Sequence, residues 1–143
     1  MEKDFQKWHT LKSEIDIKHK PPLFREQEIW WCSLGANVGF EEDGKNDLFE
    51  RPVLVFRKFN KELFLGLPMT SKKKEGKYYQ VVSLHDMERS AILSQIRVLS
   101  GKRLIRRLGK LSDKQFSALE NSFILLIKET DPFRGPRVPN GNL

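Results

Sequence analysis

Apolar side chains recur at helical spacing near the N-terminal end of the chain. Between residues 4 and 20 they return every three or four positions, at Phe5, Trp8, Leu11 and Ile15. We therefore predict an amphipathic helix over this segment. Pro21 and Pro22 end it, because proline lacks the amide donor and its ring disfavours helical angles in the preceding residue.

A second helix is predicted near the C-terminal end. Ser112 and Gln115 have the spacing of a capping box, in which the two side chains bind amides of the first helical turn. The helix behind them places five apolar residues on one face: Phe116, Leu119, Phe123, Leu126 and Ile127. Residues 129–143 are rich in proline and glycine, so we predict a flexible tail.

Short apolar segments between the two helices predict β-strands. They span residues 28–34, 52–56, 62–69, 78–82 and 91–99. The unbroken apolar run at residues 53–56 predicts a strand buried on both faces. Residues 102–109 are expected to form a short helical turn. Several short strands with one packed C-terminal helix predict a small, mainly β (α+β) barrel.

The predicted organisation is a helical extension over residues 1–24, a barrel domain over residues 25–128 and the tail. The 143 residues suffice for one domain with a hydrophobic core. A loop of about 15 residues separates the first two strands, and a loop of this length inside a domain is usually functional or disordered. Its acidic residues lack the alternating ligand spacing of an EF-hand, so calcium binding is not predicted.

The charge is concentrated in the middle of the chain. The net charge of +7 divides into −4 for residues 1–50, +11 for residues 51–110 and zero for the remainder. Clustered cations favour a polyanionic partner, nucleic acid first, although a solvated lysine-rich surface would have the same composition. No apolar run reaches the roughly 20 residues of a membrane helix, and no secretory signal or disulfide framework is present. We therefore expect a cytoplasmic protein with no membrane partner.

The residues available for chemistry favour the binding of anions. The three histidines and the single cysteine have no zinc-site spacing, and no phosphate-binding glycine loop occurs. We therefore predict no metal and no cofactor. Cys32 lies in an apolar segment, which indicates a buried structural thiol. Any catalytic machinery would consist of Arg, Lys, Ser, Thr and Gln, which suit the stabilisation of charge on phosphate oxygens.

Five ordered motifs make the chain resemble the MazF/PemK family of toxins from type II toxin–antitoxin systems. They are "EIWWCSLGANVGFEEDG", "RPVLVF", "LGLPMTS", "LSQIRVLSGKRLIRRLGKLSD" and the helix that follows. Each motif is weak alone, but the ordered set covers about residues 27–128. The resemblance implies an SH3-like (CcdB-like) barrel that forms a homodimer and has a cognate antitoxin as its partner. It also implies metal-independent, sequence-specific cleavage of single-stranded RNA, specifically mRNA.

The family pattern assigns catalysis to Arg51 of the Arg-Pro motif and to Thr70, with Ser71 beside it. A guanidinium presents donors in a fixed fork that matches phosphate geometry, and a hydroxyl can donate to phosphate or accept from a ribose 2′-OH. Arg51 is a poor base at neutral pH because its pKa exceeds about 12. Its expected role is therefore electrostatic stabilisation, and the general base stays open. A required 2′-OH would exclude DNA as a substrate.

Seven further residues are candidates for RNA binding: Lys72, Lys73, Lys74, Gln95, Arg97, Phe40 and Tyr79. The lysines would hold the RNA backbone without sequence choice, unless they form only a solvated loop. Gln95 would read a base, and Arg97 would bind RNA or form a structural or dimer-interface ion pair. The two aromatic residues would either stack on bases or pack in the core.

Three departures from the family pattern keep other functions open. Some members use an Asp and an Arg just before the Gln-x-Arg motif, where this chain has Ser94 and Ile92. The loop before Arg51 is also longer than usual, and the N-terminal helix lies outside the common barrel. The alternatives are a non-catalytic barrel that binds RNA or a protein target such as gyrase, and a nucleic-acid-binding domain outside any toxin system.

Overall fold

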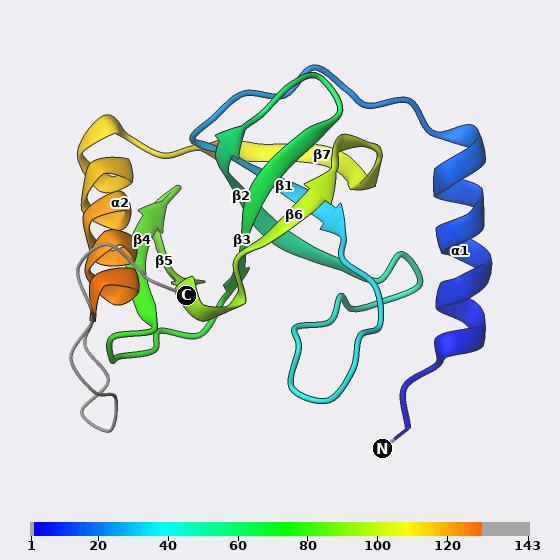
Figure 1. Ribbon diagram of the computed structural model, residues 1–143, viewed down its shortest axis with the longest axis horizontal. Helices are drawn as coiled ribbons and strands as arrows, with labels where there is room; N and C mark the ends of the chain where they lie inside the picture. Colours follow the sequence, from blue (N-terminus) through cyan, green and yellow to red (C-terminus); the bar gives the residue numbers. More distant parts are fainter. Residues whose placement is uncertain (1, 130–143) are drawn as a thin grey trace, which may run out of the picture.

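One curled antiparallel sheet lies between two helices that sit at opposite sides of the molecule (Figure 1). The computed structural model describes residues 2–129. Within them the strands are β1 (Glu28–Ser33), β2 (Glu50–Lys58), β3 (Leu63–Thr70), β4 (Tyr79–Leu84), β5 (Met87–Ile92), β6 (Arg97–Ser100) and β7 (Leu104–Lys110). The helices are α1 (Phe5–Lys18) and α2 (Asp113–Lys128), with short 3-10 turns η1 (Leu93–Gln95) and η2 (Gly101–Arg103). The strand order is β4-β5-β3-β2-β1-β7, and β6 pairs with β3. The predicted mainly β barrel is confirmed as a curled half-barrel.

The centre of the sheet is buried on both faces, as the apolar run in β2 predicts. Val53, Leu54 and Val55 are all inaccessible to solvent. Leu54 packs in the core cluster beneath α2, whereas Val53 and Val55 pack in a second cluster on the other face with Phe24. Alternation along a strand therefore divides one apolar run between two cores. This double burial makes β2 a rigid support for the residues at its two ends.

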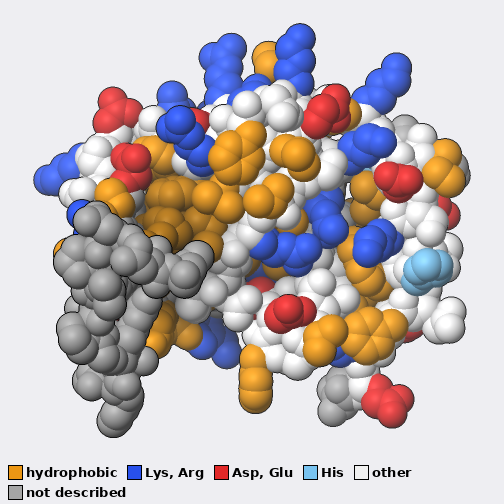
Figure 2. All heavy atoms as spheres, viewed as in Figure 1, with side chains coloured by type: hydrophobic (Ala, Val, Ile, Leu, Met, Phe, Trp, Pro, Cys, Tyr) orange, Lys and Arg blue, Asp and Glu red, His pale blue; other side chains and the backbone are white. Residues whose placement is uncertain are grey.

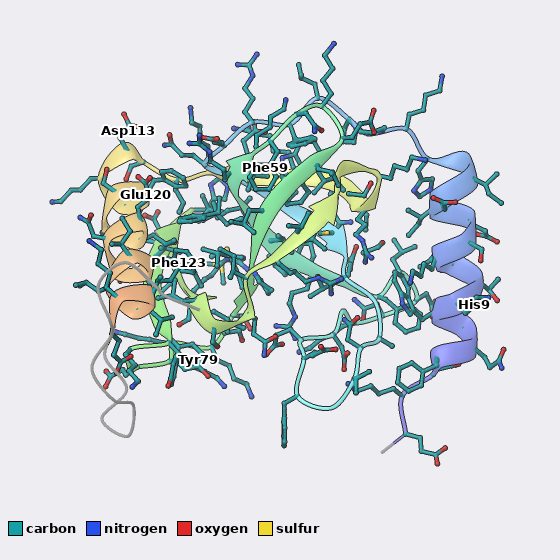
Figure 3. The ribbon with its side chains drawn as sticks, in the orientation of Figure 1. His9, Phe59, Tyr79, Asp113, Glu120 and Phe123 are labelled. Atoms are coloured by element: carbon teal, nitrogen blue, oxygen red, sulfur yellow. The ribbon has the colours of Figure 1, made fainter. Side chains whose placement is uncertain are left out.

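Helix α2 covers one face of the sheet. The Ser112 hydroxyl accepts a hydrogen bond from the Gln115 amide at 3.2 Å, which confirms the Ser112 half of the predicted capping box. The other half is wrong, because the Gln115 side chain binds the backbone of Ser83 in β4 instead. Leu119 is fully buried, and the rings of Phe123 and Phe56 have centroids 5.3 Å apart, with Phe123 pointing toward the sheet (Figure 3). The placement of Ile127 on this face was wrong, since its side chain is 60% exposed. At 3.6 residues per turn, Ile127 is rotated about 100° from the preceding, partly buried leucine.

The strand predicted over residues 91–99 is two strands. β5 pairs with the last residues of β3, opposite Met69 and Thr70, whereas β6 pairs with the first half of β3. The turn η1 carries the chain from one half of β3 to the other. The sequence pattern did not predict the start of β5, because His85 and Asp86 form the hairpin turn with φ of 51° and 61°. Two-residue hairpins of this kind usually contain Asn-Gly or Asp-Gly.

The helical turn predicted over residues 102–109 is wrong for most of its length. A 3-10 turn spans Gly101–Arg103, and the rest belongs to β7. Two register shifts interrupt the pairing of β7 with β1. These irregularities break the alternation of polar and apolar residues, so the strand period of two is not visible in the sequence.

Helix α1 packs on the long loop before β2 rather than on the sheet. Trp8 and Ile15 are buried together with Ala36 and Phe49 of the loop. Gly35 has a φ of +96°, and a Cβ on it would lie 2.3 Å from the Trp8 ring, so only glycine fits there. No helix within residues 2–129 has the length and apolar character needed to cross a membrane. The tail predicted to be flexible lies almost entirely outside the described residues.

Candidate active site

The beginning of β2 and the end of β3 meet at one rim of the sheet. The two strands are antiparallel with Val53 opposite Pro68, and the same register, continued, places Arg51 opposite Thr70. A pocket of about 190 Å³ opens at this rim, lined by Trp31, Lys45, Asn46, Glu50, Arg51, Pro52, Met69, Thr70, Ser71 and Arg89. The structure therefore brings together the three residues expected to be catalytic.

The Arg51 guanidinium is held from three sides. Nε donates to the Asp43 carbonyl at 2.7 Å, and Nη1 donates to the Met69 carbonyl at 3.0 Å. Nη2 forms an ion pair with Glu42 at 3.0 Å, and the Arg51 side chain is 14% exposed. The guanidinium thus ties the long loop to the end of β3. Its orientation is fixed, but part of its charge is neutralised by Glu42.

The loop that supplies these partners is itself fixed from two directions. Lys3, just before α1, forms an ion pair with Asp43 at 3.0 Å and donates to the Gly39 carbonyl at 2.9 Å. From η1, the Gln95 amide accepts from the Glu42 amide at 3.2 Å and donates to the Phe40 carbonyl at 3.0 Å. The position of Arg51 therefore depends on contacts from Lys3, near the N-terminus, and from Gln95, in the middle of the chain.

Thr70 and Ser71 lead into an exposed basic turn. The Thr70 hydroxyl accepts from the Lys72 amide at 3.3 Å, and the Lys74 amide donates to the Ser90 hydroxyl of β5 at 2.9 Å. Lys73 forms an exposed ion pair with Glu88 at 3.1 Å. The ammonium group of Lys74 lies 5.5 Å from the centre of the Tyr79 ring. These lysines lie beside the pocket and do not line it.

A second hollow of about 690 Å³ lies on the other side of the Arg51–Glu42 ion pair. Its lining includes Phe40, Glu42, Gln95 and Arg97. Phe40 is fully exposed, so the alternative of core packing is wrong for this residue. Arg97 has no salt bridge to another part of residues 2–129, which removes an intrachain ion pair as its role.

Tyr79 is separate from both hollows. It lines a third depression together with Ser122 and Leu126 of α2. Figure 3 shows Tyr79 on the α2 side of the molecule. Of the residues expected to bind RNA, Phe40, Gln95 and Arg97 therefore share one hollow next to Arg51, whereas Tyr79 lies elsewhere. Figure 2 shows Lys and Arg side chains along the upper edge and middle of one face, with Asp and Glu between them.

Cys32 of β1 and Arg103 of η2 have shifted pKa values. Burial raises the pKa of the Cys32 thiol to about 12, while Arg103 and Arg97 act in the opposite direction. Cys32 is fully buried and is a structural thiol, as expected. Burial also lowers the pKa of Arg103, with a smaller contribution from the nearby charge of Arg97. No histidine lines the pocket, and residues 2–129 contain no cluster of three His, Cys, Asp or Glu side chains that could hold a metal.

Sequence reasoning did not identify several residues of the pocket wall. Lys45 and Asn46 come from the long loop, Trp31 from β1 and Arg89 from β5. Finding Arg89 required the pairing of β5 with the end of β3, which the unusual hairpin turn conceals. Trp31 was assigned to a strand, but the sequence does not indicate which face of that strand borders the pocket.

The fold and the residues at the rim together define a class of protein. Its members are small, curled antiparallel half-barrels with a C-terminal helix and a pocket of arginine and hydroxyl groups at one rim. Residues 25–127 match the family described as PemK-like, MazF-like toxin of type II toxin–antitoxin system. The chain belongs to this family. The matched range begins after α1, so the N-terminal helix is an addition to the family domain.

Similar solved structures have the same fold. MazF (Form-I) from Deinococcus radiodurans aligns with a TM-score of 0.60 at 16% identity, over 76% of this chain and 99% of that one. An endoribonuclease in complex with its cognate antitoxin, from a mycobacterial species, aligns with a TM-score of 0.57 at 10% identity, over 77% and 100%. The MazE–MazF complex (Form-II) from Deinococcus radiodurans aligns at 0.54 and 14% identity, over 76% and 99%. No curated protein sequence matches this chain significantly.

Proposed function

We propose that this protein is the toxin of a type II toxin–antitoxin system and acts as a sequence-specific endoribonuclease on single-stranded mRNA. Arg51, Thr70 and Ser71 form its active site, and the reaction uses no metal ion. The observation that carries the proposal is the pocket in which a fixed guanidinium and two hydroxyl-bearing residues meet at the adjoining ends of two adjacent strands. Sites on such strands hold their geometry better than sites on loops.

The reaction fits these groups. The ribose 2′-oxygen forms a bond to the adjacent phosphorus and loses its proton, while the bond from phosphorus to the 5′-oxygen breaks and that oxygen gains a proton. The products are a 2′,3′-cyclic phosphate and a 5′-hydroxyl end. Negative charge grows on the phosphate oxygens in the transition state, and donors held in place beforehand stabilise it. Arg51 supplies such donors, and Thr70 can donate to phosphate or accept from the 2′-OH.

The second hollow is the proposed binding site for the nucleotides next to the cleaved bond. Phe40 is free to stack on a base, and Arg97 can bind the RNA backbone. Gln95 can read a base only if its amide releases the loop carbonyl or amide that it now binds. Lys72, Lys73 and Lys74 extend the basic surface beside Thr70, whereas Tyr79 would meet only RNA that continues toward α2.

Two partners are part of this proposal. A cognate antitoxin would occupy the RNA-binding surface and block it, as expected for a family with antitoxin complexes among its similar structures. A second copy of the chain would form the homodimer. Light scattering of the purified protein, alone and with the antitoxin, tests both: a monomer that no antitoxin binds would contradict them.

Cleavage of a long single-stranded RNA in excess EDTA tests the central activity. The wild-type protein should produce discrete fragments, and Arg51→Ala and Thr70→Ala should each lose most of the activity, by about a hundredfold or more. Arg57→Gln is a matched control, because it removes an arginine charge from the far end of β2, where the side chain is 69% exposed. DNA of the same sequence should remain intact.

Two results would contradict the proposal at different levels. RNA that stays intact with wild-type protein would exclude the nuclease. Unchanged cleavage by Arg51→Ala, with circular dichroism matching wild type, would exclude the site. Arg51→Lys should be included because Arg51 also holds the loop, and a lysine keeps the charge without the fork of donors.

A non-catalytic barrel is the second candidate function. The observation that favours it is that all three nitrogens of Arg51 already have partners within the protein. Such a protein would bind RNA, or a protein target such as gyrase, without chemistry. RNA binding in a gel-shift assay without any cleavage, at protein concentrations that saturate the RNA, would select this alternative.

A further inference from the structure

The pocket at the rim contains three cationic side chains but little uncompensated negative charge. Lys45, Arg51 and Arg89 line it, together with one carboxylate, Glu50. Glu50 is 9% exposed, and both of its oxygens accept from Arg106 at 3.3 Å. That carboxylate is therefore already neutralised, and the pocket has a net positive charge suited to an anion.

Arg51 alone does not meet the need for a phosphate-binding cation. Its ion pair with Glu42 and its bonds to two carbonyl oxygens use each of its three nitrogens at least once. A guanidinium has five N–H donors, so two remain on the terminal nitrogens. The charge available to an incoming phosphate is nevertheless reduced by the carboxylate that already accompanies it.

Arg89 differs from Arg51 in its hydrogen bonds and ion pairs. Its Nε is buried and has no hydrogen-bond partner, and it is the only side-chain nitrogen or oxygen in this state within residues 2–129. Arg89 also forms no salt bridge within that part of the chain. Burying a donor without a partner costs free energy, and such a group in a native protein calls for an explanation. A ligand that brings acceptors into the pocket and draws the guanidinium toward them is one.

The position of Arg89 matches this role. Ser90 lies opposite Thr70 in the pairing of β5 with β3. Arg89 directly precedes Ser90 in β5, so it lies one position along that strand from the residue opposite the proposed catalytic threonine. The Ser90 hydroxyl binds the Lys74 amide and fixes the basic turn against β5. Arg89 therefore projects from a strand that is anchored on both sides, by β4 and by β3.

We propose that Arg89 is a further catalytic residue, which binds the phosphate on which Arg51 and Thr70 act. When phosphate binds, two of its nitrogens donate as a fork to two phosphate oxygens, and the guanidinium supplies the positive charge that Glu42 partly removes from Arg51. This inference rests on the proposed ribonuclease function and adds to it a residue outside the motifs of the sequence. It assigns Arg51 to orientation and transition-state donation, and Arg89 to phosphate binding.

Single-turnover cleavage by Arg89→Gln and Arg89→Lys tests the catalytic part. Arg89→Gln should lower the cleavage rate at saturating RNA by about a hundredfold, the usual cost of losing a donor to developing charge. Arg89→Lys should recover part of it, because the charge remains without the fork. Arg57→Gln, which removes a charge outside the pocket, should cleave like wild type. Wild-type rates in Arg89→Gln would overturn the proposal.

Binding of a fully 2′-O-methylated RNA, which cannot be cleaved, separates this inference from the nuclease activity. Loss of one phosphate contact should reduce the slope of log K against log salt by about 0.7 for a single strand. Arg89→Gln should show this reduction and Arg57→Gln should not. If wild type cuts no RNA but the slope still changes, the nuclease function fails while the phosphate contact stands. An unchanged slope overturns the contact.

Stability of the free protein gives a third readout. Arg89→Met removes a buried donor that has no partner, so its urea midpoint should equal or exceed that of wild type. A residue with a structural role would lower the midpoint instead. A clear decrease in the midpoint of Arg89→Met would therefore overturn the assignment of Arg89 to a ligand.

Discussion

The two helices both bury apolar residues at helical spacing, but they have different partners. α2 packs its apolar face on the core of the sheet through Phe116 and Leu119. α1 packs Trp8 and Ile15 on the loop that precedes β2, in a separate small cluster. Only α2 lies within the range that matches the family. The difference indicates that α2 supports the fold, whereas α1 supports the loop that holds Arg51.

The loop connects α1 to the proposed chemistry. Lys3 binds Asp43, the Asp43 carbonyl binds Arg51, and Arg51 binds the carbonyl of Met69 beside Thr70. Disrupting α2 should therefore unfold the protein, and disrupting α1 should loosen the site in a protein that remains folded.

The largest effect is expected in α2. Leu119 is fully buried, so Leu119→Ala should lower the free energy of unfolding by about 2–5 kcal/mol. The matched change in α1 is Ile15→Ala, at a residue that is 6% exposed. Because Ile15 packs on the loop and not in the core of the sheet, Ile15→Ala should cost clearly less. Urea denaturation followed by fluorescence measures both, and equal losses would show that α1 belongs to the same cooperative unit.

The next effect concerns activity. Trp8→Ala should release the loop, because the Trp8 ring packs on Phe49 and against Gly35. A site displaced by about 1 Å can lose up to a hundredfold in rate, so we expect RNA cleavage to fall by roughly ten- to a hundredfold. Hydrogen exchange should increase in residues 35–49 and not in β2 or β3. Faster exchange throughout the sheet would contradict a local role for α1.

Cys32 should make the stability of the protein depend on pH. It lies in the core cluster that contains no residue of either helix. Burial holds the folded-state pKa at about 12, against an ordinary value near 9. Between these values the unfolded chain loses the thiol proton and the folded protein keeps it, so stability falls as pH rises, by at most about 1.4 kcal/mol per pH unit. Cys32→Ala should lack this contribution. Urea titrations at pH 8 and pH 10 measure the difference between the two slopes, and parallel slopes would contradict it.

The smallest effects are expected at the helix caps. The Ser112 hydroxyl caps α2, and the Asp4 carboxylate accepts from the Lys7 amide at 3.0 Å to cap α1. Ser112→Ala should lower the free energy of unfolding by about 1 kcal/mol. Asp4→Ala should leave the urea midpoint nearly unchanged and speed hydrogen exchange in α1 alone. A larger midpoint change from Asp4→Ala than from Ser112→Ala would reverse the comparison of the helices.

The sequence was sufficient where local pattern and tertiary role agree. The apolar run around Leu54, the Ser112 cap and the spacing of Trp8 and Ile15 all have the structure that their periodicity predicts. The pattern failed where pairing irregularities decide the structure, as in the bulged β7 and the hairpin turn at His85.

The candidate site was predictable in part for the same reason. Arg51 and Thr70 stand at the ends of two consecutive strands, so an antiparallel pair brings them to one rim. Arg89 reaches that rim from β5, through a pairing that no local pattern indicates. The contact of Lys3 with Asp43 joins segments 40 residues apart, and long-range ion pairs of this kind leave no periodic signal.

The most direct test of the account is cleavage of an RNA with a single altered ribose. After the cleavage site has been mapped, the 2′-hydroxyl on its 5′ side is replaced by hydrogen, and the RNA is incubated with wild-type protein in EDTA. Cleavage should disappear at this position, while an unmodified copy of the site in the same strand should be cut normally. Cleavage at the deoxy position would show that the 2′-oxygen is not the nucleophile and would contradict the proposed mechanism.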